Sequence, residues 1–311
     1  MKPASIISMI VAVLLIIAGF VTCLIAQNMA EAEGQMLFAE NRDYGLVNTL
    51  DLAETAISKL EINVQDADVH IYGGSESSYI ELVNFRENYY SCNTSNRVVT
   101  FDEVPDVTSM LKFWENGVSF KGIRYLLTFG EEEPEGDKVI NVYLGGENID
   151  LKIVSITGKT CNVSLENMTY SADYTITLEE GSLHSKNMKT SSQLTVTGNK
   201  VALDLQDSSF NTCNLQCTDL TLDVMKVYMP MTTIQCTTID ADITPTQTIA
   251  SLNYEVAVKN GSVTVNGNNL GTGFVQNASS NNRFELKADS GAVLLNDPPK
   301  EDIKTWPPTA D

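Results

Sequence analysis

Basic residues are scarce in this 311-residue sequence, which has 20 Lys and Arg against 40 Asp and Glu and a formal net charge of −20. Nucleic-acid-binding proteins hold the phosphate backbone with a surplus of Lys and Arg, so a general nucleic-acid binder is excluded. Histidine is scarcer still, with only His70 and His184. That excludes His-rich metal sites and catalysis by several histidines.

The sequence also lacks the local signatures of nucleophilic catalysis. No Gly-x-Ser-x-Gly elbow is present. A serine or cysteine nucleophile needs a base within hydrogen-bond reach, usually His. His70 alternates with Val69 and Ile71, so we expect it to face solvent from a strand. His184 follows Gly181-Ser182-Leu183 at a predicted corner, and we expect it to face solvent as well.

Paired carboxylates are the next candidates for chemistry. Asp66 with Asp68, and Asp240 with Asp242, could act as acid and base or bind Ca²⁺. Asp-x-Asp is also common in turns, because Asp hydrogen-bonds its own backbone. The glycine-rich stretch 267–273 does not open a helix. We therefore assign no catalytic, cofactor-binding or metal-binding residue, and expect no enzyme activity and no cofactor.

Six cysteines occur: Cys23, Cys92, Cys161, Cys213, Cys217 and Cys236. Cys23 falls in the first apolar run, which leaves an odd number in the rest of the chain and argues against a complete disulfide framework. Cys217 and Cys236 are spaced so that they could stack in adjacent coils. Buried thiols are the favoured interpretation, and one disulfide is the alternative.

One long apolar run stands at the start of the chain. Residues 6–26 (IISMIVAVLLIIAGFVTCLIA) contain no charge, and roughly 20 apolar residues suffice to span a bilayer. Lys2 precedes the run and acidic residues follow it, which predicts a cytoplasmic N-terminus and an extracytoplasmic body. A cleaved signal peptide is the alternative, with Ala30-Glu31-Ala32 as the cleavage site, but its apolar region should be shorter.

The rest of the chain shows a period of two. Alternating apolar and polar residues over 60–72, 79–83 and 139–144 predict strands. From about 147, short alternating segments repeat every 20 residues or so: Leu165-Glu166-Asn167-Met168 returns as Ser185-Lys186-Asn187-Met188, and Leu183 as Leu203. Such a repeat suits one coil of a β-solenoid.

The predicted fold is therefore all-β: a β-solenoid of short strands with about 20 residues per coil, preceded by one transmembrane helix. An antiparallel β-sandwich is the alternative. It is favoured locally by Asn260-Gly261, a type I′ hairpin signal between two strand patterns. The predicted divisions are a cytoplasmic N-terminus (1–5), an anchor (6–26), a stalk (27–58), an N-terminal β region (59–146) with an insertion (84–136), the repetitive body (147–296) and a disordered Pro-rich tail (297–311).

These features together resemble a known family. The strand pair over 57–71 (ISKLEINVQDADVHI), followed by Gly181-Ser182-Leu183 and Gly261-Ser262-Val263, resembles the bacterial putative-adhesin domain family of unknown function. The resemblance covers roughly 57–295, and 84–136 departs from it. It implies a surface-exposed β-solenoid without established enzymatic activity, and it supplies no functional residue.

The expected function is a non-catalytic, adhesin-like binding module at the cell membrane. Its partners would be the membrane, through the single span, and envelope polymers or surface proteins. A carbohydrate-active enzyme on a solenoid scaffold, or an accessory subunit of an envelope-stress or transport system, are the alternatives.

The predicted topology can be tested by protease treatment of intact cells. If 6–26 is an uncleaved anchor, the protease should remove the body and leave a small N-terminal fragment in the membrane, seen by mass spectrometry. A mature protein free in the medium and beginning near Glu33 would contradict the anchor.

Overall fold

The computed structural model describes residues 47–53, 56–85, 90–103, 137–146, 149–188 and 193–303. The chain divides into two units, and the unit made of Met1–Tyr44 and Asp106–Glu135 lies outside the described residues, as does the predicted span 6–26. Every element below belongs to the unit made of Gly45–Pro105 and Gly136–Asp311. Among the residues described, no helix is long and apolar enough to cross a bilayer.

The described chain is all-β, as predicted from the period of two. Its strands are β1 (Val47–Asp51), β2 (Ile57–Asp66), β3 (Asp68–Ser75), β4 (Tyr79–Val83), β5 (Tyr90–Ser95), β6 (Val98–Glu103), β7 (Val139–Gly145), β8 (Ile149–Glu166), β9 (Asp173–Lys186), β10 (Gln193–Gln206), β11 (Thr212–Val227), β12 (Met231–Pro245), β13 (Asn253–Val265), β14 (Asn268–Asn269), β15 (Gly273–Gln276) and β16 (Arg283–Leu295). Two short 3₁₀ turns, Ile249–Ser251 and Lys300–Asp302, complete the list.

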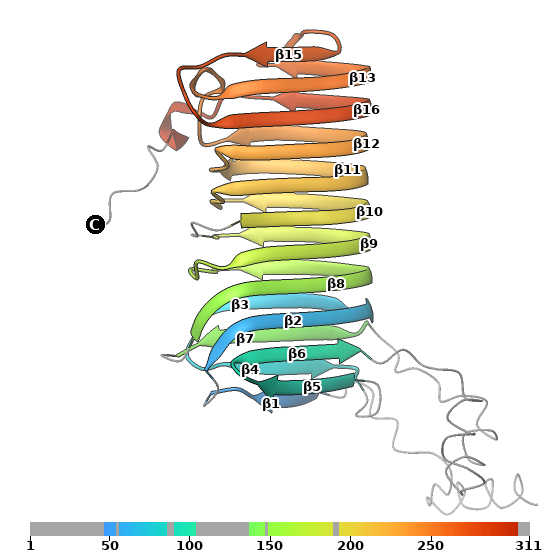
Figure 1. The fold of residues 1–311 in the computed structure, drawn as a ribbon, viewed down its shortest axis with the longest axis vertical. Helices are drawn as coiled ribbons and strands as arrows, with labels where there is room; N and C mark the ends of the chain where they lie inside the picture. The colour runs from blue at the N-terminus through green and yellow to red at the C-terminus, as the bar shows by residue number, and fades with distance from the viewer. Residues whose placement is uncertain are drawn as a thin grey trace, which may run out of the picture. The chain divides into compact units, whose positions relative to one another are not determined.

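The strands of the body are long, so the predicted short strands are wrong. β8 has 18 residues and β13 has 13. Each long strand nevertheless serves two layers: the first half of β8 pairs with β2, whereas its second half pairs with β3. In Figure 1 the ribbon turns over at one edge and runs back behind itself. Each continuous strand therefore spans what the alternation pattern had divided into two short strands.

The corner between the halves is visible in the burial pattern. In β9, Tyr174, Ile176 and Leu178 are buried, two exposed glutamates follow, and burial resumes at Leu183. The same pair of exposed residues recurs in β8, β10, β11, β12 and β13. The shift in phase allows both halves to direct their apolar side chains into one core.

The predicted 20-residue register is confirmed for β8, β9 and β10, where Leu183 pairs with Leu203 in a parallel ladder. It shortens to 19 residues between β10, β11 and β12. Asn167 and Asn187 take the left-handed conformation, at φ 56° each, which Asn tolerates better than most residues. Met168 and Met188, which follow them, are fully buried. The sequence repeat therefore marks the turn that closes each coil.

The expected hairpin at Asn260-Gly261 is wrong. Both residues lie inside β13 and pair in parallel with Ser290 and Gly291 of β16. They occupy a corner, where a Cβ on Gly261 would lie 1.8 Å from the Gly291 carbonyl oxygen. The hairpin is at the next Asn-Gly, Asn266-Gly267, which joins β13 to β14 with φ of 48° and 78°.

The two ends of the stack are antiparallel. β5 pairs antiparallel with β6, and β1 with β4, at the N-terminal end. β14 and β15 pair antiparallel with the two halves of β13 at the other end. The last strand, β16, lies between β12 and β13 and is parallel to both, as Figure 1 shows. β13 follows β12 in the sequence but does not pair with it, because β16 lies between the two strands.

The predicted divisions of the chain overlap several of these strands. β1 and the start of β2 lie within the predicted stalk, and β5 and β6 lie within the predicted insertion. Glu103, at the end of β6, accepts hydrogen bonds from the backbone N–H groups of Gln65 and Asp66 and pairs with Lys138 Nζ at 2.9 Å. This buried carboxylate therefore holds the corner between β2 and β3.

A matched pair of substitutions in β10 tests which side chains face the core. Leu203 is 2% exposed, whereas the adjacent Ala202 is exposed. Leu203→Asp should lower the free energy of unfolding by roughly 3–5 kcal/mol, because it removes packed methyl groups and buries a charge. Ala202→Asp should lower it by less than about 0.5 kcal/mol. Equal effects in urea denaturation would contradict the assigned strand phase.

Candidate functional site

The outward side chains of successive coils form columns, because the ladders are parallel and in register. Over strands β8 to β12 of the first layer, two columns contain only hydroxyl and amide side chains. Together they form the hydroxyl–amide face: Ser155, Thr175, Thr195, Asn214 and Thr233 in one column, and Thr157, Thr177, Thr197, Gln216 and Gln235 in the other. Beyond these strands the first column continues with Glu61 and Glu285, and the second with Asn63 and Lys287. Neighbouring coils are also linked through this face, since the hydroxyl oxygens of Thr177 and Thr197 lie 3.2 Å apart.

The second layer carries ionisable groups instead. One column, the histidine–aspartate column, consists of Ser164, His184, Asp204, Asp223 and Asp242 on strands β8 to β12. His70 of β3 continues it beyond Ser164. Each member is the register partner of the next, so neighbouring backbones are about 4.8 Å apart.

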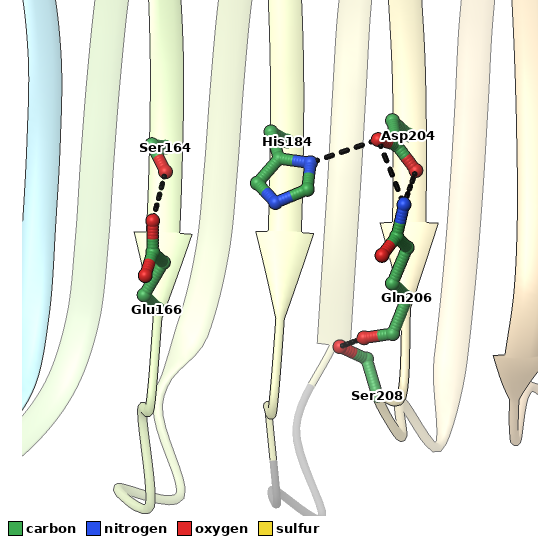
Figure 2. A network of polar contacts seen from close by, with 6 residues as sticks. All are labelled: Ser164, Glu166, His184, Asp204, Gln206 and Ser208. Carbon is green, nitrogen blue, oxygen red and sulfur yellow. Dashed lines mark hydrogen bonds and ion pairs between the residues drawn. The ribbon is translucent and has the colours of Figure 1, made fainter.

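His184 and Asp204 form the closest contact in this column. The Nδ1 atom of His184 lies 2.9 Å from Asp204 Oδ2. The His184 side chain is 36% exposed and the Asp204 side chain is 40% exposed. Gln206 Nε2 donates to both Asp204 oxygens, at 3.0 and 3.1 Å. Figure 2 shows this arrangement from close by. Gln206 and His184 therefore fix the orientation of the carboxylate from two sides.

Ser164, His184 and Asp204 have the residue types of a catalytic triad but not its geometry. Ser164 is buried, and its hydroxyl donates to Glu166 Oε1 at 3.2 Å rather than to the imidazole. In Figure 2 the serine is turned toward Glu166, and His184 toward Asp204. A triad requires the base to accept the proton of the nucleophile. Within the described part of the chain, no hydrogen bond joins Ser164 to His184.

The three aspartates of the column repel one another. The pKa of Asp223 is raised above its ordinary value, first by partial burial and then by the charges of Asp204 and Asp242 on either side. Like charges directly opposite in a ladder are destabilising. Over the described residues, no group of three or more His, Cys, Asp or Glu side chains is arranged to hold a metal ion.

His70 is placed as predicted, on the outward side of β3 between the buried Val69 and Ile71. Its ring stacks on Tyr72 at a centroid distance of 6.2 Å, and Tyr72 stacks on Tyr143 at 5.2 Å. Burial is the main cause of the raised pKa of both tyrosines. His70 therefore stacks on a neighbour along β3, whereas Tyr72 stacks on Tyr143 across the β3–β7 ladder.

The two carboxylate pairs have separate surroundings. Asp68 Oδ1 accepts hydrogen bonds from the backbone and side-chain amides of Asn162, at 3.2 and 2.9 Å. Asp66 is exposed at the end of β2. Asp240 and Asp242 are both exposed on β12, and Asn296 donates to Asp242 at 3.4 Å. In the described part of the chain, the hydrogen bonds of Asp68 and Asp242 are to asparagine side chains or backbone.

All five cysteines in the described chain are thiols, with Cys161, Cys213 and Cys217 buried and Cys92 and Cys236 half-buried. The predicted stacking of Cys217 on Cys236 is confirmed, because the two are register partners in β11 and β12. Burial raises the pKa of each of these two thiols to about 11.

The contact between His184 and Asp204 was missed at the level of sequence. The available signal was their separation of 20 residues, the same as that of Leu183 and Leu203. Applying the 20-residue spacing to polar as well as apolar positions would have predicted Ser164, His184 and Asp204 as neighbours. Asp223 and Asp242 follow at a spacing of 19 residues.

Comparisons with known proteins add little to this geometry. No protein family profile and no curated protein matches the sequence. One solved structure, a putative cell adhesion protein from Clostridium sporogenes, is similar at a TM-score of 0.39 and 10% identity, over 81% of this chain and 98% of that one. The likeness is too distant to assign a function.

The aspartates of the histidine–aspartate column should make stability depend on pH. Because the pKa of Asp223 is raised, ionising it is less favourable in the folded chain than in the unfolded chain. Stability should therefore fall as the pH rises from the ordinary pKa of 3.8 through the raised value. Asp223→Asn should be more stable than the parent at pH 7, by less than about 1 kcal/mol because the group is exposed, and the difference should vanish in acid.

Asp240→Asn is the matched control, since it removes the same charge from a position flanked by Thr221 and Ala292. A gain for Asp240→Asn equal to that for Asp223→Asn would show that net charge, not the column, sets the effect. The gain should also shrink at high salt.

Proposed function

We propose that this protein is a non-catalytic, adhesin-like binding module built on a β-solenoid and presented outside the cell by its N-terminal apolar segment. The solenoid assignment is supported by parallel coils that advance 19 or 20 residues and by long strands that each serve two layers. The assignment to the membrane is supported by the uncharged run 6–26.

The observation that carries the binding proposal is the hydroxyl–amide face. All ten of its positions are Ser, Thr, Asn or Gln, although the chain as a whole has a net charge of −20. An uncharged surface on an acidic protein can approach a hydroxyl-rich polymer without desolvating charges. Regular columns of donors and acceptors suit a ligand that is itself extended and repetitive. A neutral polysaccharide of the cell envelope or of a host surface has this chemistry.

The alternative of a carbohydrate-active enzyme is favoured by one feature, the His184–Asp204 pair. The enzyme alternative is less favoured because the Ser164 hydroxyl donates its hydrogen bond to Glu166 and not to His184. An accessory role in an envelope-stress or transport system would use a protein partner instead of a glycan.

The binding proposal predicts that retention depends on one face. The purified protein should be retained on insoluble neutral glycans such as β-glucan, mannan or chitin, without releasing soluble sugar. Thr177→Lys, within the hydroxyl–amide face, should weaken retention roughly tenfold, because it replaces a neutral donor–acceptor with a larger cation.

Thr221→Lys is the control, since it makes the same change at an exposed position of the second layer. Equal losses for both variants would contradict the assignment to the hydroxyl–amide face. Release of sugar that disappears in His184→Ala would contradict the non-catalytic proposal. No retention on any glycan would leave a protein partner as the alternative.

A further inference from the structure

Two cysteines occupy equivalent corner positions in adjacent coils. Cys217 lies in β11, directly before the exposed pair that turns the strand, and Cys236 lies at the same point of β12. Their column continues with Gly198 on one side and Ala288 on the other. Residues with small side chains therefore flank the pair on both neighbouring strands.

The backbone separation at this position suits a disulfide. Neighbouring strands are about 4.7–4.9 Å apart, and disulfide-linked residues usually have Cα atoms roughly 4.4–6.8 Å apart. As in-register partners on parallel strands, the two residues direct their Cα–Cβ bonds the same way. Their Cβ atoms are then about one strand spacing apart, slightly more than the roughly 3.5–4.5 Å between the Cβ atoms of a disulfide. Bond formation therefore needs a small approach of the two Cβ atoms as well as rotation about the Cα–Cβ bonds.

Each thiol has one hydrogen bond, on the side away from the other cysteine, that disulfide formation would break. Cys217 bonds to the backbone of Gly198. Cys236 Sγ lies 4.0 Å from the carbonyl oxygen of Lys287, a long and weak contact. The charge of Cys236 contributes to the raised pKa of Cys217, after burial, as expected for neighbouring thiols. Other thiols in the described residues lack such a neighbour: Cys213 pairs with Leu194 and Thr232, Cys161 with Gly181, and Cys92 with Phe101.

We propose that Cys217 and Cys236 form a disulfide across the β11–β12 ladder when the protein folds in the presence of a small-molecule disulfide. With glutathione disulfide as oxidant, one protein thiolate attacks it and releases one reduced glutathione. The second protein thiolate then attacks the mixed disulfide and releases another. Two protein thiols are oxidised to one disulfide, and the two electrons and two protons end on the two glutathione molecules.

The bond should form during folding rather than afterwards. A thiolate is the attacking species, and a buried thiol with a raised pKa is rarely ionised. The same burial should protect the finished bond from reductants. The cross-link joins consecutive coils, so it should stabilise the stack by restricting the unfolded chain.

The test is to refold the full chain in detergent, once with reduced and oxidised glutathione and once with reductant alone. Non-reducing peptide mapping should identify a Cys217–Cys236 peptide in the first sample and alkylated thiols in the second. The oxidised sample should melt roughly 5–10 °C higher. Cys213→Ser should retain this difference, whereas Cys217→Ser and Cys236→Ser should each abolish it.

Two results would overturn the proposal. One is full alkylation of both thiols after redox refolding of a protein with native β circular dichroism. The other is a Cys217–Cys236 bond found only in material that melts below the reduced protein. If the single serine variants fail to fold, the Cys217→Ala/Cys236→Ala double variant provides the comparison, and its melting temperature should not depend on the redox buffer.

Discussion

The structure depends on one constraint, the parallel backbone ladder whose register advances by one coil. Because position n pairs with n + 20 or n + 19, residues that are 19 or 20 positions apart in the sequence lie beside each other on neighbouring strands. Apolar positions then form a continuous core, in which Leu183, Leu203 and Leu222 occupy one column. Polar positions form equally continuous columns outside. The hydroxyl–amide face, the histidine–aspartate column and the cysteine pair all follow from this register.

A run of parallel strands has two edges, each a row of unpaired backbone groups that favours aggregation. This chain ends both layers with antiparallel strands, β5 and β15 in one layer and β1 and β14 in the other. The C-terminal end is built in an unusual order, since β13 leaves room for β16 to enter beside β12. β16, the last strand of the described residues, therefore hydrogen-bonds to a parallel strand on each side.

Much of this fold was predictable from the sequence, because alternation and the coil repeat are local or short-range signals. The pairing of Leu183 with Leu203 and of Cys217 with Cys236 follows from counting. The position of β16 does not, since Met231 pairs with Arg283 across a gap that no repeat encodes. Asn260-Gly261 misled because the same dipeptide suits a hairpin and a tight corner, and only the partner strand distinguishes them.

For the candidate site, composition excluded several classes of functional site but did not identify the residues of one. The sequence shows that the local catalytic motifs considered above are absent, but it does not predict the side-chain orientations of Ser164 and His184. Those orientations depend on Glu166 and Asp204, which lie on different coils.

The most direct test of the account is a methyl nuclear Overhauser experiment on selectively leucine-labelled protein. The register predicts cross-peaks between Leu183 and Leu203 and between Leu203 and Leu222, which are neighbours in the ladder. It predicts a much weaker peak or none between Leu183 and Leu222, which are two strand spacings, about 9–10 Å, apart. A strong Leu183–Leu222 peak without the two intermediate ones would contradict the parallel coil register, and with it the columns on which every functional inference rests.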